Sequence, residues 1–143
     1  MNGAAGKATA INYDHAGGTM NIVIRVGPIE LKAALNNTHT ARKIAGIIPL
    51  KSPFNTWGDE IYFPIPVEAE LEPSAQEEVQ IGDLGYWPAG NAFCIFFGPT
   101  PLSRDGRIIP ASAVNIIGKI TEDATRLREA GEQTHVELIP LPE

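Results

Sequence analysis

The most apolar stretch of the sequence is Asn91-Ala92-Phe93-Cys94-Ile95-Phe96-Phe97, and it runs directly into the turn-rich segment Gly98-Pro99-Thr100-Pro101. The stretch is short, aromatic and followed by glycine and proline, which predicts a buried β-strand. Side chains alternate across a strand, so Phe93, Ile95 and Phe97 share one face and Cys94 and Phe96 share the other. We expect one of these faces to fill the core and the other to line a groove.

Further strands and two short helices are predicted on both sides of this stretch. The predicted strands are 21–26, 29–35, 60–67, 91–97, 114–120 and 135–141, with an exposed edge strand around residues 68–72. Helices are predicted after the caps Asn37 or Thr38 and Thr121, ending near 48 and 130. Segments 82–90 and 98–109 are predicted as a turn-dense connection and a long loop. Mostly antiparallel strands with two covering helices predict a mainly β fold, a barrel with helical lids.

Length and composition limit the organisation and the classes of function. The 143 residues are predicted to form one domain over 20–143, with 1–19 as a disordered leader or tag. A net charge of −6 argues against nucleic-acid binding. No apolar run suits a membrane span and no signal pattern is visible, so we expect a cytoplasmic protein without a membrane partner. The single cysteine and three dispersed histidines predict no metal site, and no motif indicates a cofactor.

Four blocks of sequence follow one another along the chain. They are Asn55-Thr56-Trp57-Gly58-Asp59-Glu60-Ile61-Tyr62-Phe63, Gly82-Asp83-Leu84-Gly85-Tyr86-Trp87-Pro88, Phe93-Cys94-Ile95-Phe96-Phe97-Gly98-Pro99-Thr100-Pro101 and Pro110-Ala111-Ser112-Ala113-Val114-Asn115-Ile116-Ile117-Gly118-Lys119-Ile120. Together they resemble the small prokaryotic single-domain proteins with a cyclophilin-like fold, over about residues 20–140. The resemblance implies a closed eight-stranded barrel with a short helix at each open end, and a binding groove on the outside of the barrel.

Cyclophilins proper are peptidyl-prolyl isomerases, and this sequence departs from them at the catalytic positions. Where they carry Arg-Ile-Ile-Pro, the nearest stretch here is Glu60-Ile61-Tyr62-Phe63-Pro64, and Val114 stands in place of the pocket histidine. An ionised glutamate cannot donate a hydrogen bond to the prolyl nitrogen. The usual isomerase mechanism therefore lacks its arginine, and Arg104 or Arg107 on the following loop are the candidates to replace it.

The candidate site is a groove beside the strands near residues 60 and 95. Alternation places Glu60 and Tyr62 on one face, as the candidate catalytic pair. Glu60 would accept from a ligand amine or amide, or act as a general base if burial raises its pKa. The resemblance implies that Ile95 and Phe97 face the groove, with Cys94 and Phe96 in the core. The predicted ligand-binding residues are Asn55, Trp57, Ile95, Phe97, Thr100 and Arg104.

Each of these residues also has a structural interpretation. Glu60 would otherwise form a salt bridge at a strand end, Phe97 would pack in the core, and Asn55 would hold a turn. Trp57 and Trp87 would either anchor loops on the barrel or form a binding wall.

Three functions stay open on this basis. The first is a binding module for a small molecule, a small amide or a short peptide, including one that contains proline, with Phe97 as an anchor. The second is a weak or atypical prolyl isomerase. The third is a small-molecule enzyme that uses Glu60 as acid or base. The oligomeric state expected for any of these is a monomer or a homodimer.

Overall fold

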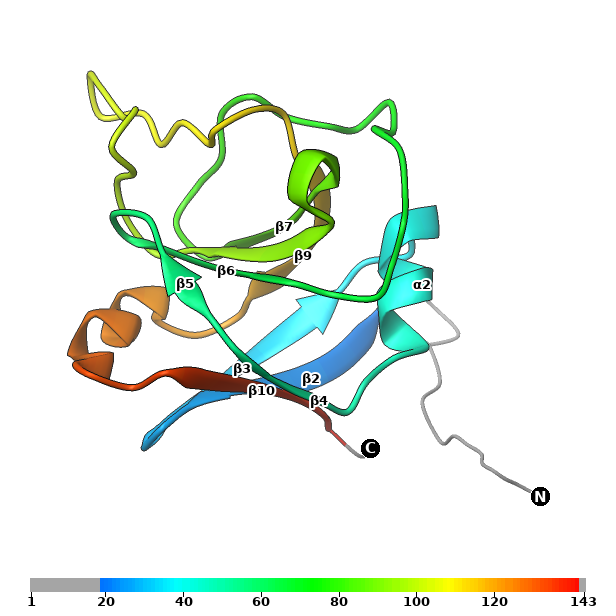
Figure 1. Cartoon of the computed structure of the whole chain (residues 1–143), viewed down its shortest axis with the longest axis horizontal. Helices are drawn as coiled ribbons and strands as arrows, with labels where there is room; N and C mark the ends of the chain where they lie inside the picture. The colour runs from blue at the N-terminus through cyan, green and yellow to red at the C-terminus, as the bar shows by residue number, and fades with distance from the viewer. Residues whose placement is uncertain (1–18, 142–143) are drawn as a thin grey trace.

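The protein forms one antiparallel sheet that curls into a nearly closed barrel, as the computed structural model of residues 19–141 shows (Figure 1). The predicted leader lies almost entirely outside the described residues. Along the sheet the strands follow the order β4-β10-β2-β3-β9-β7-β8-β6-β5. Their bounds are β2 Met20–Val26, β3 Ile29–Leu35, β4 Leu50–Pro53, β5 Asn55–Thr56, β6 Glu60–Pro64, β7 Asp83–Trp87, β8 Ala92–Phe96, β9 Asn115–Ile120 and β10 His135–Pro140.

The barrel closes through the chain itself. Strands β4 and β5 stand at the two ends of the sheet order, yet only Phe54 separates them in sequence. The backbone N–H of Phe54 donates to Thr134 O at 3.0 Å, which keeps this residue beside the start of β10. If β4 and β5 are counted as one bent strand, the barrel has the eight strands that were expected. The predicted fold class, a mainly β cyclophilin-like barrel, is therefore confirmed.

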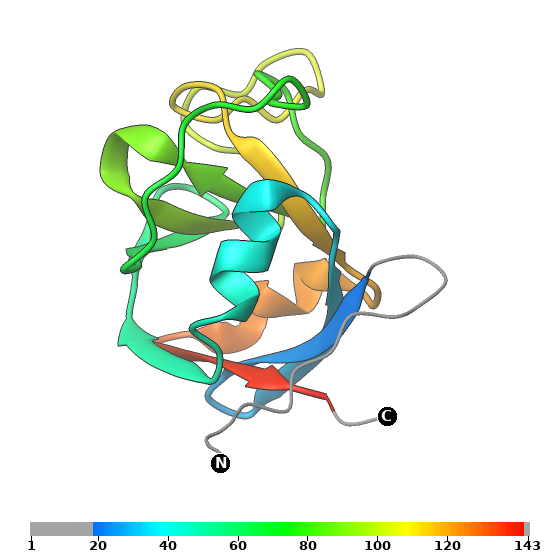
Figure 2. The ribbon, with the colours of Figure 1, turned by 90° about the vertical axis from the view of Figure 1, so that its right-hand side faces the viewer.

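Helix α2, His39–Ala45, covers one end of the barrel (Figure 2). Its N-cap is Thr38, whose hydroxyl accepts from the Ala41 N–H at 3.2 Å, as the sequence predicted. Apolar side chains on one face enter the core, because their spacing of three and four residues places them on the same side of the helix. The buried residues of the helix are Thr40, Ala41, Ile44 and Ala45.

The second lid differs in type from the prediction. Ala124–Ala130 forms a 3-10 helix, η2, and lies at the side of the barrel opposite α2 (Figure 1). Its cap is Asp123 rather than Thr121, and the Asp123 carboxylate accepts from the Thr125 N–H at 3.0 Å. A seven-residue segment with only Ala124 and Leu127 buried has a narrow apolar contact. The tighter i, i+3 winding matches that contact because the two buried positions are three residues apart.

Segment 82–90 is a strand followed by a short 3-10 helix, η1 (Pro88–Gly90), and not the connection that its turn-forming residues predicted. Strand β7 lies inside the sheet, between β8 and β9. Gly85 suits this position because a Cβ there would approach the Val114 side chain to 3.1 Å. Glycine in this strand thus reflects close packing rather than a turn.

The expected edge strand around residues 68–72 is also absent, since residues 65–82 of the described chain form a long loop with two isolated bridges. In this 65–82 loop, Glu68 and Glu70 are exposed, whereas the Glu72 carboxylate accepts from the Thr40 N–H at 3.0 Å. The alternating residues Glu68, Glu70 and Glu72 therefore do not form one face of a strand.

The register of β6 against β8 decides which side chains lie inside the barrel. Ile61 pairs with Ile95, while Tyr62 pairs with Cys94. Residues directly opposite in an antiparallel pair share a face of the sheet. Ile61, Phe63, Phe93, Ile95 and Phe97 accordingly belong to the main core.

The expected orientation of β8 is therefore wrong. Ile95 and Phe97 point into the barrel with 0% and 5% of their surface exposed. Cys94 and Phe96 form part of a second, smaller apolar cluster on the outer face of the sheet. In this register Phe96 and Cys94 share a face with Glu60 and Tyr62. The groove therefore cannot be lined both by Glu60 and Tyr62 and by Ile95 and Phe97, as the sequence analysis expected. The predicted role of Phe97 as a ligand anchor loses its geometric basis.

Candidate functional site

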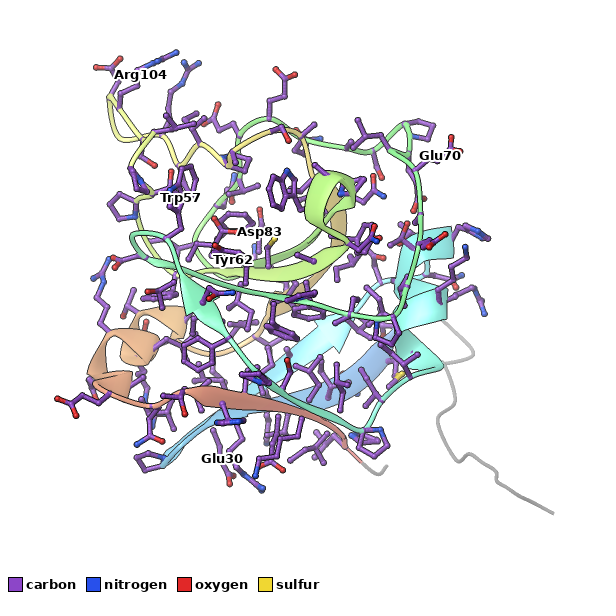
Figure 3. All side chains as sticks on the ribbon, viewed as in Figure 1. Glu30, Trp57, Tyr62, Glu70, Asp83 and Arg104 are labelled. Atoms are coloured by element: carbon purple, nitrogen blue, oxygen red, sulfur yellow. The ribbon has the colours of Figure 1, made fainter. Side chains whose placement is uncertain are left out.

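A pocket of about 230 Å³ opens on the outer face of the sheet. Three parts of the chain that are distant in sequence form it: the turn after β5 together with strand β6, the end of β7, and the loop that precedes β9. The residues that line it are Trp57, Glu60, Tyr62, Trp87, Pro110, Ala111 and Val114. Figure 3 shows Trp57 and Tyr62 on the side of the sheet that faces this loop. Aromatic and aliphatic walls around few polar groups are typical of a small-molecule site.

Glu60 is the charged residue of the pocket. It pairs with Phe96 across β6 and β8, and only 6% of its surface is exposed. Removal from water disfavours the ionised carboxylate and raises the pKa of Glu60 to about 7, although hydrogen bonding to the Cys94 thiol lowers this pKa in part. Burial and the neighbouring Glu60 charge likewise raise the pKa of the Cys94 thiol.

The alternative interpretation of Glu60, an exposed salt bridge, is not what the structure shows. Within residues 19–141 the ion pairs found do not include this carboxylate, and its neighbour Asp59 instead pairs with Arg128 at 3.1 Å. Glu60 is thus a buried acid whose pKa is raised to about 7 by burial, which is the condition set for a general base, and its catalytic role stays a prediction.

Trp57 is held by a tight turn. Its backbone N–H donates to the backbone carbonyl of Glu60 at 2.9 Å, and Gly58 within the turn adopts a φ of 62°. A Cβ on Gly58 would lie 2.8 Å from Pro99 O, so the turn packs closely against the next loop. Only glycine fits this position, because it combines the left-handed conformation with close contact to a backbone.

Trp87 forms the opposite wall and anchors a loop. Its indole N–H donates to the Ser112 hydroxyl at 2.6 Å. The ring also covers Gly90, where a Cβ would approach it to 2.7 Å. Trp87 is thus a loop anchor that also lines the pocket, and its role as a binding wall stays a prediction. Pro110, Ala111 and Val114, which complete the lining, were not predicted, because a loop of small apolar residues carries no signal of its own.

The other predicted ligand-binding residues lie away from the pocket lining. Thr100 is buried, and its hydroxyl donates to Ile109 O and bonds with Ser103, so it shapes the loop. Asn55 is exposed on β5. Arg104 is exposed at a turn whose tip points away from the barrel (Figure 3). Arg107 reaches Glu78 at 3.5 Å. The structure thus brings together Trp57, Glu60 and Tyr62 of the predicted set and leaves the others outside.

Two further observations concern the described part of the chain. Residues 19–141 contain no group of three or more His, Cys, Asp or Glu side chains arranged to hold a metal ion. None of the helices within that range has the length and apolar character that crossing a membrane requires.

Comparison with known proteins agrees with this architecture. A family model described as cyclophilin-like matches residues 20–139. The chain belongs to this cyclophilin-like family. It is also similar to a hypothetical protein from Archaeoglobus fulgidus whose solution structure is known, with 38% sequence identity and a TM-score of 0.72. The similarity covers 89% of this chain and 98% of that one. No curated protein matches the sequence.

Proposed function

We propose that this domain is a binding module that holds one compact group of a small molecule or short peptide in the outer pocket. The observation that carries the proposal is the combination of Trp57, Tyr62 and Trp87 with the buried acid Glu60 around one cavity. Apolar parts of the ligand would contact the rings, and an amide or amine N–H would meet the carboxylate. At about 230 Å³ the cavity is smaller than the roughly 300–1,000 Å³ of drug-sized sites, which favours a single group.

A panel of small amides, small amines and a proline-containing tetrapeptide tests this proposal by chemical-shift perturbation in NMR. We expect at least one probe to shift the indole N–H resonances of Trp57 and Trp87 in a saturable manner. Substitution Ala111→Phe should abolish these shifts, because Ala111 is an exposed residue of the lining and a larger side chain would fill the cavity. Leu102→Phe, at an exposed position outside the lining, is the matched control and should leave them unchanged.

Failure of every probe to shift the pocket resonances would contradict the proposal. Equal shifts in wild type and the Ala111→Phe variant would do so as well, because they would place binding elsewhere.

A second function has one observation in its favour. A carboxyl group with a pKa of about 7 exchanges protons at neutral pH and is suited to general acid–base catalysis. If turnover of a substrate is found, Glu60→Gln should remove it while Asp59→Asn should not. Prolyl isomerisation has no comparable support, because the pocket lining holds no arginine. A tetrapeptide isomerisation assay at high protein concentration tests it, and we expect the uncatalysed rate.

A further inference from the structure

We propose that the group held in the pocket is an alkylated ammonium ion, enclosed by Trp57, Tyr62 and Trp87 with the Glu60 carboxylate as its counter-charge. This inference rests on the proposed binding function and specifies its ligand class. Three lines of evidence support it: the convergence of the rings, the isolation of the carboxylate, and the apolar remainder of the lining.

The rings reach the cavity from three different segments. Trp57 comes from the turn after β5, Tyr62 from the middle of β6, and Trp87 from the end of β7. The faces of aromatic rings carry negative electrostatic potential, and several rings around one point attract a cation more strongly than one ring does. The Trp87 N–H is already bonded to Ser112, so this indole serves the cavity as a wall and not as a donor.

The charge balance favours a cation over an anion. Glu60 is the acid in a lining that contains no lysine, arginine or histidine. The titratable group that faces it from the adjacent β8 is the Cys94 thiol, which is uncharged because burial raises its pKa. The arginines of the neighbouring loop are placed elsewhere, Arg107 beside Glu78 and Arg104 at the exposed tip. A bound cation would supply the missing partner, whereas an anion would be repelled.

The apolar remainder of the lining favours an alkylated ion over a primary ammonium. Pro110, Ala111 and Val114 present only aliphatic side-chain surface, so they cannot replace the water around a strongly hydrated charge. Methyl groups on nitrogen spread the charge over a larger surface and weaken its hydration. They also contact aliphatic and aromatic walls as hydrocarbon does. A compact quaternary ammonium group that carries three methyl groups meets both requirements of the cavity.

A pair of probes with the same shape and different charge tests the inference. Choline carries a trimethylammonium group, and 3,3-dimethylbutan-1-ol carries a tert-butyl group in the same position. By calorimetry at about pH 8 we expect wild type to bind choline about tenfold or more tightly than the neutral alcohol. Glu60→Gln should reduce choline affinity by about tenfold and leave binding of the alcohol unchanged. Asp59→Asn, which removes a neighbouring charge outside the lining, should retain wild-type affinity.

The dependence on pH provides a second readout. Choline affinity should rise between about pH 6 and about pH 8 as Glu60 loses its proton, and it should then level off. The Glu60→Gln variant should show no such rise. Equal affinity for the two probes, or loss of choline binding in Asp59→Asn to the same extent as in Glu60→Gln, would overturn the inference.

Failure of this inference can be separated from failure of the proposed function. If the neutral alcohol or a small amide shifts the pocket resonances and choline does not, the cation assignment is wrong and the binding function stands. If none of the probes shifts them, both are wrong.

Discussion

At the scale of single residues, Glu60 links the architecture of the barrel to its chemistry. The residue is on a strand whose alternate members, Ile61 and Phe63, lie in the main core. Its own side chain is on the outer face, in the pocket that the aromatic rings also line, and it is largely shielded from solvent. A carboxyl group in this environment destabilises the folded protein when it ionises, because it loses hydration without gaining a cation.

The pH dependence of stability should reveal this cost. The pKa of Glu60 is raised from 4.5 to about 7 in the folded protein. Between these values the unfolded chain has lost the proton and the folded protein retains it, so the Glu60 contribution to the free energy of unfolding falls as pH rises. Above about pH 7 it falls no further. The total is at most about 3 kcal/mol.

Urea denaturation of wild type and Glu60→Gln at several pH values measures this contribution. We expect the variant to match wild type near pH 4.5 and to exceed it by up to about 3 kcal/mol near pH 8. Because other carboxylates act equally in both proteins, the difference isolates Glu60. A difference that stays constant over this pH range would show that the carboxyl is not desolvated.

Part of the candidate site could be predicted from single residues in the sequence. Alternation correctly placed Glu60 with Tyr62, and the tryptophans were singled out because they are costly to expose in turns. The orientation of β8 could not be obtained from the sequence, because its residues are apolar on both faces and all five are buried. The pairing of Tyr62 with Cys94, together with the division of the side chains between the main core and the outer cluster, shows which face is outward.

At the scale of elements, the 65–82 loop is the feature that supports the pocket. Its Gln76 exchanges backbone hydrogen bonds with Val114 at 2.9 and 3.0 Å, which holds a residue of the pocket lining. The loop is tied to the barrel by Asn115, which is fully buried. The Asn115 amide donates to Glu70 O at 2.9 Å and to the Thr40 hydroxyl at 3.1 Å, and its carbonyl accepts from the Glu72 N–H at 2.8 Å.

Replacement of Asn115 should therefore loosen the loop and destabilise the protein. Asn115→Ala leaves the buried partners without hydrogen bonds, and we expect a loss of about 2–4 kcal/mol in the free energy of unfolding. Gln76→Ala, at an exposed side chain of the same loop, should change it by less than about 0.5 kcal/mol. Chemical denaturation measures both values. Amide hydrogen exchange should locate the loosening in residues 70–76, and unchanged protection there would refute the anchoring role.

At the scale of the whole molecule, the barrel depends on close contact between β3 and β9. Gly118 pairs with Leu35, and a Cβ built on Gly118 would lie 2.3 Å from Ala34 O. Such a distance cannot be accommodated without moving a strand, because the obstructing atom belongs to the backbone. Because Gly118 has no side chain, β9 can lie close enough to β3 for the two strands to pair.

Gly118→Ala should be disproportionately destabilising for the addition of one methyl group. We expect a loss of about 1–3 kcal/mol or more in the free energy of unfolding, measured by thermal or urea denaturation. Gly46→Ala is a suitable comparison because its nearest neighbour, Lys43 O, is 3.3 Å away and its φ of −72° is ordinary. If Gly118→Ala is no worse than Gly46→Ala, the β3–β9 contact is not limiting.

Local patterns in the sequence were enough to predict the mainly β class, a barrel with two helical lids, the cap of helix α2, and the position of Glu60 and Tyr62 on one face of a strand. These features follow from local patterns, because alternation, capping and helical spacing act over a few residues. Three-dimensional packing was needed to show that β7 is a central strand, that Ile95 and Phe97 lie inside, and that Pro110, Ala111 and Val114 line the pocket together with the tryptophans. Those features depend on strand register and on loops that meet across the sheet, and contacts between residues so distant in sequence leave no periodic signal in either segment.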